Sequence, residues 1–218
     1  MNAAILDTET TGIESPALVE AAWLAIESPL ALVAAAEFCG RFNPGKPIEF
    51  SAMATHHIIN EDVAGAPSPA TFALPDGCEY IIGHNIDFDW KVIGEPKVKR
   101  ICTLAFSRKL WPDGAHSLGA MLYRLEGPSA RERLRGAHSA AVDVDNCRIL
   151  LGHILSNLKG VRTWDDLYQQ CETARVPDVM PFGKHKGTRL KDVPADYKQW
   201  LLKQPDVDPY LVKALRAK

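Results

Sequence analysis

The amino-acid sequence predicts an α/β protein. Short apolar runs such as residues 3–6 and 78–83 are typical of buried strands, whereas longer segments such as residues 139–158 repeat their apolar residues at helical spacing. Strands that alternate with helices indicate an α/β domain. Of the 218 residues, 46% are hydrophobic and 24% are charged, so the chain can bury a sizeable core and is not disordered.

The first half of the chain supplies the predicted strands. Residues 3–6 form an apolar run that stops at Asp7, and residues 78–83 and 99–103 give two more strands. Residues 17–43 are ambiguous, because Ala and Leu favour a helix whereas Pro29 breaks the segment as a turn between antiparallel strands would. Composition alone does not choose between a helix and a hairpin there.

Helices are expected over residues 103–110, 116–125, 139–158 and 163–174. The third is the clearest, because apolar residues recur along one of its faces at Cys147, Leu150, Leu151, Ile154 and Leu158. The fourth starts at Thr163, whose hydroxyl can cap a helix. Residues 176–178 then form a predicted linker.

Composition excludes several classes of protein. The longest apolar run, residues 30–36, is far shorter than the roughly 18 residues that a membrane-spanning helix needs. An acid at Asp7, close to a start without basic residues, does not fit a secretory signal. The five cysteines are odd in number and never closely paired, which disfavours a disulfide framework and favours a reducing, cytoplasmic location.

Charge is unevenly distributed. Residues 181–218 contain nine Lys or Arg and four Asp or Glu, a net of +5, whereas the preceding residues contain 16 basic and 23 acidic ones, a net of −7. An acidic body with a basic tail is compatible with a carboxylate-lined metal site beside a surface that binds a polyanion.

Several acids fall where they could meet a cation. Asp7 and Glu9 are two apart and can point the same way, and paired carboxylates repel each other unless a cation such as Mg²⁺ lies between them. In the helix over residues 139–158, Asp143 falls within the apolar stripe, whereas Asp145 points to the opposite side. Burial of a charged acid on a core-facing stripe costs free energy of folding, unless the acid binds a metal or hydrogen-bonds to a nearby backbone turn. Asp145 is therefore interpreted as a solvent-exposed acid.

Two further positions complete the candidate set. Asp87 and Asp89 both follow the strand that ends near His84, and either could join the other acids. His138 stands just before the third helix, where a side chain that titrates near neutral pH could take a proton from water. The plainer interpretation of His138 is a capping or surface histidine.

Together these residues resemble the DEDD superfamily of 3′→5′ exonucleases, in the branch whose last motif carries histidine. The motifs are Asp-Thr-Glu-Thr-Thr-Gly at residues 7–12, His-Asn-Ile-Asp-Phe-Asp at residues 84–89, and His138 with Asp143. Three motifs in family order make the resemblance specific, and it covers residues 1 to about 160. In the second motif the family's acid follows the Phe, which selects Asp89 over Asp87.

The resemblance implies a ribonuclease H-like fold, with a mixed five-stranded sheet flanked by helices and with residues 17–43 as two of its strands. It also implies two ions of Mg²⁺ or Mn²⁺, held by Asp7, Glu9, Asp89 and Asp143, and it implies His138 as the general base that deprotonates the attacking water. The predicted catalytic set is these four acids together with His138.

Four substrate-binding residues are likewise implied by the resemblance: Thr10, Ile13, His56 and Asn85. In family members the residue at the position of Ile13 wedges against the terminal base, and that of Thr10 lies by the terminal nucleotide. His56 lies in an Ala-Thr-His-His-Ile stretch that is similar to the family's Ala-x-x-His-Gly-Ile segment, with His57 where Gly is usual.

The predicted domains are an exonuclease domain at residues 1–160, a helix and linker at 161–177, and a small basic module at 178–218. The sequence Phe-Gly-Lys-His-Lys-Gly at residues 182–187 is typical of a tight hairpin and resembles the tail of exonuclease X-like proteins, so a small ββα-like cap is expected. Its basic residues are either phosphate contacts or merely solvated: Lys184, Lys186, Arg189 and Lys191.

The leading hypothesis is a metal-dependent exonuclease that releases nucleoside 5′-monophosphates from single-stranded DNA or from DNA 3′ ends. An exoribonuclease that trims RNA 3′ ends would carry the same motifs. A non-catalytic nucleic-acid-binding module is a third hypothesis, and the five intact catalytic positions argue against it.

Overall fold

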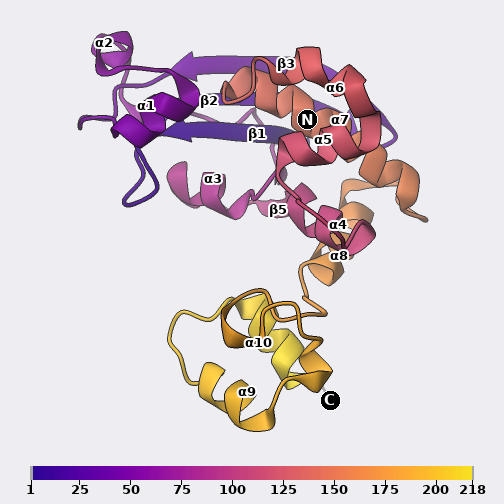
Figure 1. Cartoon of the computed structure of the whole chain (residues 1–218). Coiled ribbons are helices and arrows are strands. Elements are labelled where there is room, and N and C mark those ends of the chain that lie inside the picture. The colour runs from indigo at the N-terminus through magenta and orange to yellow at the C-terminus, as the bar shows by residue number, and fades with distance from the viewer. Residues whose placement is uncertain (1, 218) are drawn as a thin grey trace.

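The computed structural model describes residues 2–217 and contains one mixed five-stranded sheet (Figure 1). The strand order is β3-β2-β1-β4-β5. The strands are β1 (Ala3–Thr10), β2 (Leu18–Ser28), β3 (Ala31–Arg41), β4 (Tyr80–Gly83) and β5 (Lys99–Cys102). Strands β1, β2 and β3 pair antiparallel, whereas β4 and β5 run parallel to β1. The predicted α/β class and mixed five-stranded sheet are confirmed.

The ambiguous segment 17–43 is a hairpin of two long strands. Strand β2 lies inside the sheet and is buried along nearly its whole length, so its sequence has no alternation of apolar and polar residues that would mark it as a strand. Ser28 holds the turn, because its hydroxyl oxygen accepts a hydrogen bond from the backbone N–H of Leu30. Sheet pairing therefore overrides the helix propensity of this Ala-rich segment.

Strand β1 is longer than its apolar run predicts. The apolar run ends before Asp7, but the strand continues to Thr10. Beyond Ile5, which pairs with Ile82 of β4, the polar part of β1 pairs with β2 alone. Asp7 and Glu9 consequently lie within a strand and share one of its faces, instead of occupying a loop.

Helices and short 3₁₀ turns connect and cover the sheet (Figure 1). The helices of the larger part are α1 (Phe50–His56), α2 (Asn60–Val63), α3 (Asp87–Val92), α4 (Thr103–Leu110), α5 (Leu118–Glu126), α6 (Ala130–Leu134), α7 (Ala140–Asn157) and α8 (Trp164–Ala174). The four predicted helices correspond to α4, α5, α7 and α8. Helix α8 begins with the predicted Thr163 cap, in which Thr163 and Asp166 form a capping box.

Helix α7 positions one side of the candidate site. It packs against β1, β2 and β3, and its buried face carries the predicted apolar stripe of Cys147, Leu150, Leu151 and Ile154. Burial of this stripe against the sheet fixes the rotation of the helix about its axis. The first turn of α7 is therefore held at a defined position beside β1 and β2.

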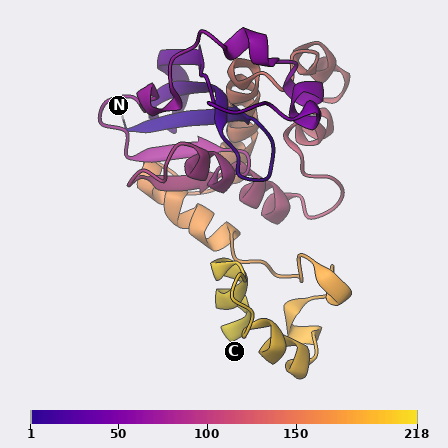
Figure 2. The same ribbon diagram turned by 90° about the vertical axis from the view of Figure 1, so that its left-hand side faces the viewer.

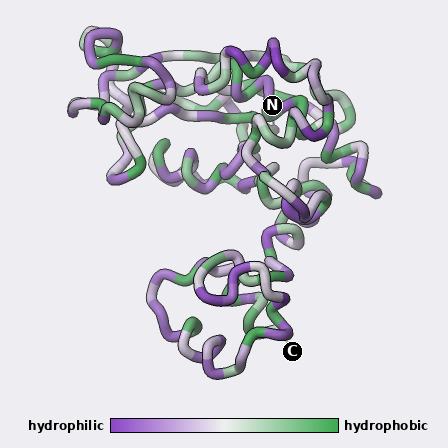
Figure 3. Tube along the Cα trace, viewed as in Figure 1, coloured by the Kyte–Doolittle hydropathy of each residue, from purple (hydrophilic) through white to green (hydrophobic). Residues whose placement is uncertain are grey.

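Residues after α8 form a separate small cluster beneath the sheet (Figure 2), which we refer to as the C-terminal module. Its core consists of five buried apolar residues: Met180, Leu190, Val193, Leu201 and Leu211. It contains 3₁₀ turns at Gly183–His185 and Leu190–Asp192 and the helices α9 (Ala195–Leu201) and α10 (Pro209–Arg216). Hydrophobic and hydrophilic segments alternate along its trace (Figure 3), as expected for a unit with so small a core.

The module differs from the expected ββα-like cap. In place of two strands, the described chain has an isolated bridge between Val179 and Arg189 that closes the predicted hairpin. The small Gly-rich turn supplies few residues for a sheet, and α9 and α10 contribute Leu201 and Leu211 to the core. The predicted domain limits at 160 and 178 remain predictions.

The helices and the cysteines of the structure relate to the predictions of no membrane span and no disulfide framework. Within residues 2–217, no helix is both long and apolar enough to cross a bilayer. All five cysteines are free thiols, and Cys102, Cys147 and Cys171 are buried.

Candidate active site

Three carboxylates from two elements meet at one point. Asp7 and Glu9 project from the same face of β1, and Asp143 comes from the first turn of α7. One oxygen of each carboxylate lies within 4.8 Å of the others. The sequence thus correctly placed these three acids together, although Asp143 is far from the other two along the chain.

The backbone around α7 orients Asp143. Its Oδ2 accepts a hydrogen bond from the backbone N–H of His138 (2.8 Å), and its Oδ1 accepts one from the side-chain amide of Asn146 (3.1 Å). Asp145 is turned away and forms an ion pair with Arg148 at 2.6 Å. The helical phase predicted from the apolar stripe therefore distinguishes these two acids correctly.

The two acids of α3 also face different surroundings. Asp89 is buried and accepts a hydrogen bond from the hydroxyl of Thr8 (2.7 Å), whereas Asp87 forms ion pairs with Arg100 (2.6 Å) and Arg175 (2.5 Å). Burial raises the pKa of Asp89 to about 7, and the Thr8 hydrogen bond opposes that rise. Asp87 is thus occupied by arginines outside the cluster, and Asp89 is the acid that lies beside β1.

The cluster is short of positive charge. Burial raises the pKa of Asp7 well above its usual value, and repulsion from Asp89, Asp143 and Glu9 raises it further. Burial and the nearby Asp143 likewise raise the pKa of Glu9 to about 8. None of the ion pairs within residues 2–217 joins these acids to a Lys or Arg. A divalent cation with a preference for oxygen ligands fits such a site, because it would supply the missing charge.

His138 stands at the rim of the cluster. The residue is exposed, and its backbone adopts the left-handed conformation with φ of 66°, which is uncommon for a residue with a side chain. The hydrogen bond from its N–H to Asp143 holds it in that conformation. Residues held in such sparsely populated backbone conformations cluster at functional sites.

A curated relative shares nearly the whole length of this chain. Exodeoxyribonuclease 10 of Escherichia coli strain K12 is 28% identical over 215 residues, which cover 93% of this chain and 91% of that protein. This chain is a homologue of exodeoxyribonuclease 10. The similarity extends beyond the sheet into the C-terminal module, since it spans nearly the whole of both chains.

Solved structures agree with this assignment. A structure of exonuclease X in complex with 5′ overhanging duplex DNA superposes with a TM-score of 0.61 at 26% identity, covering 76% of this chain and 99% of that one. A 3′-exonuclease that recognises the 3′ end of histone mRNA stem-loops has the same fold, with a TM-score of 0.55 at 13% identity, covering 74% of this chain and 84% of that one. The fold of the exodeoxyribonuclease 10 homologue is ribonuclease H-like.

A family model matches the other end of the chain. Residues 171–206 match the family described as a putative quorum-sensing-regulated virulence factor. The match begins within α8 and covers the hairpin and α9 of the C-terminal module.

The predicted substrate residues of the homologue differ in exposure and in hydrogen bonding. Ile13 is 86% exposed in the loop that follows β1, and Asn85 is exposed in a left-handed conformation directly after β4. Thr10 is buried, and its hydroxyl donates to the carbonyl oxygen of Gly12. Ile13 and Asn85 are therefore open to a ligand, and Thr10 shapes the loop that carries Ile13.

His56 is engaged within the protein. Its Nδ1 accepts the backbone N–H of Ile58 (3.0 Å), so its Nε2 carries the proton and donates to the carbonyl oxygen of Thr10 (3.2 Å). Burial lowers the pKa of His56, which keeps the ring neutral in this role. The side chain ties α1 to the end of β1, and its predicted contact with the substrate remains a prediction.

His57, which follows His56, stands where the family usually has Gly. His57 ends α1 in the left-handed conformation, with φ of 60°. Glycine adopts this conformation without steric cost, which is a physical reason for the family's preference for Gly at this position.

Four residues around the site were missed by sequence reasoning: Thr8, Glu20, Phe50 and Asn146. Glu20 is buried opposite Glu9, and its carboxylate accepts hydrogen bonds from the backbone N–H of Ala140 (3.1 Å) and from Nε of Arg41 (3.2 Å). An acid flanked by apolar residues in the first half of β2 was the available signal. Phe50, at the start of α1, is 87% exposed.

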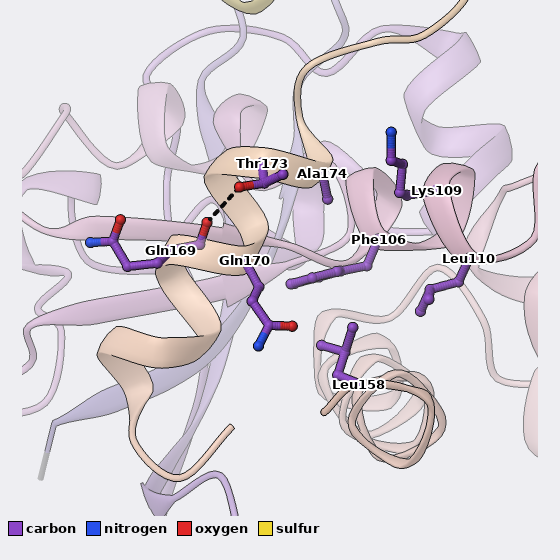
Figure 4. Close-up of a pocket in the computed structure, with 8 residues that line it drawn as sticks. All are labelled: Phe106, Lys109, Leu110, Leu158, Gln169, Gln170, Thr173 and Ala174. Carbon is purple, nitrogen blue, oxygen red and sulfur yellow. Dashed lines mark hydrogen bonds between the residues drawn. The ribbon is translucent and has the colours of Figure 1, made fainter. Parts of the chain in front are cut away.

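A separate hollow lies away from the acids. It has a volume of about 340 Å³ and lies between α4, the end of α7 and α8 (Figure 4). Its wall is largely apolar, with Phe106 and Leu158 facing Gln170, and no acid or histidine lines it. This hollow is therefore not part of the acidic site.

Proposed function

We propose that the chain is a metal-dependent 3′→5′ exodeoxyribonuclease that releases nucleoside 5′-monophosphates from DNA. The observation that carries the proposal is the meeting of Asp7, Glu9 and Asp143 within 4.8 Å in a homologue of exodeoxyribonuclease 10. Acids so close together and without basic partners favour a bound cation, and phosphodiester hydrolysis is a reaction for which such cations are used.

Asp7, Glu9 and Asp143 are the residues that would hold divalent ions, with Asp89 as a further ligand from α3. We assign two ions, Mg²⁺ or Mn²⁺, because four carboxylates exceed the charge of one divalent ion. The chemistry that such ions supply when bound is activation of the attacking water and neutralisation of charge on the phosphate and on the leaving 3′ oxygen. Thr8 orients Asp89 through its hydroxyl, and Asn146 orients Asp143 through its amide.

His138 is assigned as the general base that takes a proton from the attacking water on a ring nitrogen. Its exposed position at the rim leaves the ring free to reach the water, whereas its backbone is anchored to Asp143. The same carboxylate would thus position both the ion and the base. Proton uptake by an exposed rim histidine also allows its return to solvent after each turnover.

Exposed apolar side chains near the acids suit the end of a DNA strand. Ile13 follows β1, and Phe50 begins α1, beside the loop that carries Ile13. The two segments are joined, because the N–H of Glu49 donates to the carbonyl oxygen of Thr11 (2.8 Å). We assign Ile13, Phe50 and Asn85 to the terminal nucleotides, where apolar surfaces can pack against bases.

Digestion of single-stranded DNA labelled at the 5′ end tests this function directly. With Mg²⁺ the protein should produce a ladder that shortens one nucleotide at a time, with deoxynucleoside 5′-monophosphates as products, and EDTA should stop it. The same length of RNA tests the alternative substrate. Products that carry a 3′-phosphate, or shortening from the 5′ end only, would contradict the proposal.

A further inference from the structure

A hollow in the C-terminal module combines aromatic and basic side chains. It has a volume of about 310 Å³ and is lined by Lys184, His185, Pro194, Asp196, Tyr197 and Trp200. The rings of His185 and Tyr197 lie 4.6 Å apart, edge to face, and those of Tyr197 and Trp200 lie 5.4 Å apart. Three aromatic rings thus form a continuous wall.

The module's fold holds this wall in place. Gly183 has a positive φ of 72°, and a side chain there would collide with the Tyr197 hydroxyl, 2.8 Å from where a Cβ atom would stand. Leu201, next to Trp200, is buried in the core and anchors α9. Trp200 is nevertheless 53% exposed. A half-exposed indole on a fixed helix leaves a ring face available to a ligand.

Lys184, which lines the hollow, belongs to a basic segment of the C-terminal module. Lys184, Lys186, Arg189 and Lys191 are all exposed, and none of them belongs to an ion pair within residues 2–217. Residues 181–218 carry nine basic and four acidic side chains. The one lining acid, Asp196, uses Oδ1 to accept the N–H of Tyr197. This excess of free cations selects a polyanion as the ligand.

Contacts between the C-terminal module and the sheet domain fix the place of the hollow. Helix α9 lies below α3 in the view of Figure 1. The module is attached to the sheet domain, because the hydroxyl of Tyr210 donates to Glu172 (2.8 Å) and the guanidinium of Arg175 lies over the Tyr210 ring. Arg175 also pairs with Asp87 of α3, which links the module to the helix that carries Asp89.

We propose that this hollow binds a nucleobase of single-stranded DNA, upstream of the 3′ end that occupies the acidic site. The base stacks on Trp200 and Tyr197, and Lys184 contacts an adjacent phosphate. Stacking on aromatic rings beside a basic groove is how proteins bind single strands irrespective of sequence. The proposal deepens the proposed exonuclease function and rests on it.

Fluorescence anisotropy of a labelled oligodeoxythymidine, with the full chain in EDTA so that no cleavage occurs, tests the site. Trp200→Ala should weaken binding by about 5- to 150-fold, the effect typical of one stacked base, whereas Trp200→Phe should retain most of the affinity. Tyr123→Ala is the matched control, because Tyr123 is a similarly exposed ring on α5, and it should bind as the parent does.

An oligonucleotide of the same length that lacks bases separates stacking from phosphate contact. It should bind the parent and Trp200→Ala equally, and Lys184→Gln should reduce the slope of log affinity against log salt by about 0.7 for either oligonucleotide. Equal affinity of the parent and Trp200→Ala for the normal oligonucleotide would overturn the proposal.

The outcome is independent of catalysis. A chain that binds through Trp200 but does not cleave DNA would refute the exonuclease function and leave the binding site standing. If the parent cleaves DNA and Trp200→Ala binds DNA as the parent does, the binding site is refuted and the exonuclease function stands. Circular dichroism of each variant identifies any that fail to fold, and if Trp200→Ala does not fold, Trp200→Gln takes its place in the comparison of the two oligonucleotides.

Discussion

Two aspartates of helix α7, Asp143 and Asp145, have different contacts. Asp143 faces Asp7 and Glu9, whereas Asp145 pairs with Arg148 on the other side of α7. We predict that Asp143→Asn lowers kcat by more than about 100-fold, since even partners one shell removed from a metal cost 10–100-fold. Asp145→Asn should change kcat little. Rates at saturating Mg²⁺ compare the two, and similar losses would show that the face of α7 has been misassigned.

His138 is predicted to act through its ring and not through its backbone. His138→Ala keeps the backbone N–H that donates a hydrogen bond to Asp143, so the acids should stay in place. The value of kcat should fall by about 10²–10⁴-fold. A kcat unaffected by His138→Ala would assign the proton transfer to another group.

Among single residues, the sequence predicted the clustered acids well, but it did not predict the residues that hold them in position. Asp143 was recognisable because helical spacing fixes its face locally, within one element. Glu20 was not, because its importance depends on the register that places β2 beside β1 and α7. His56 illustrates the same limit, since only tertiary structure reveals that both of its nitrogens bond to the backbone.

At the scale of elements, Glu20 joins strand to helix. Its carboxylate holds the N–H of Ala140, the first residue of α7, and that helix carries Asp143. We predict that Glu20→Ala lowers the free energy of unfolding by about 1–3 kcal/mol, because it leaves a buried N–H without an acceptor.

The same change should also raise the Mg²⁺ concentration needed for half-maximal activity, because Asp143 loses its fixed position. Glu20→Gln keeps an acceptor and should restore most of both properties. A purely structural role would lower the melting temperature of Glu20→Ala and leave the Mg²⁺ requirement unchanged.

Helices were predicted correctly, because their apolar spacing is visible within one segment of the sequence. Strand ends were not, because they depend on pairing with another strand. Helices α4, α5, α7 and α8 follow from spacing and caps in the sequence. The polar end of β1 could not be anticipated, because residues 7–10 become a strand only through hydrogen bonds to β2. The hairpin of β2 and β3 came from the family resemblance, since its composition favours helix.

At the scale of the whole molecule, the unpaired acids make stability depend on pH and metal. Glu9 has a pKa of about 8 in the folded protein against an ordinary value of 4.5 for an unfolded chain, so between these values the folded state binds more protons than the unfolded one. Stability of the metal-free protein should therefore fall as pH rises from about 5 to about 8.

Melting temperatures in EDTA should accordingly decrease by several degrees over that pH range, since 1 kcal/mol corresponds to about 2–4 °C in a chain of this size. Saturating Mg²⁺ should remove most of the decrease by binding the ionised acids. Glu9→Gln is the control, and it should show a weaker pH dependence in EDTA. An increase in melting temperature with pH in EDTA would contradict the electrostatics of this cluster.

The central claim is that Asp7, Glu9 and Asp143 hold the ions that support cleavage from the 3′ end. The most direct measurement is the release of deoxynucleoside 5′-monophosphates from single-stranded DNA as Mg²⁺ is titrated, for the parent and for Asp7→Asn. We predict stepwise release that requires Mg²⁺ in the parent and no measurable release in Asp7→Asn at any Mg²⁺ concentration, with both proteins folded. Release by the parent in excess EDTA, or release by Asp7→Asn at the parental rate, would contradict the claim.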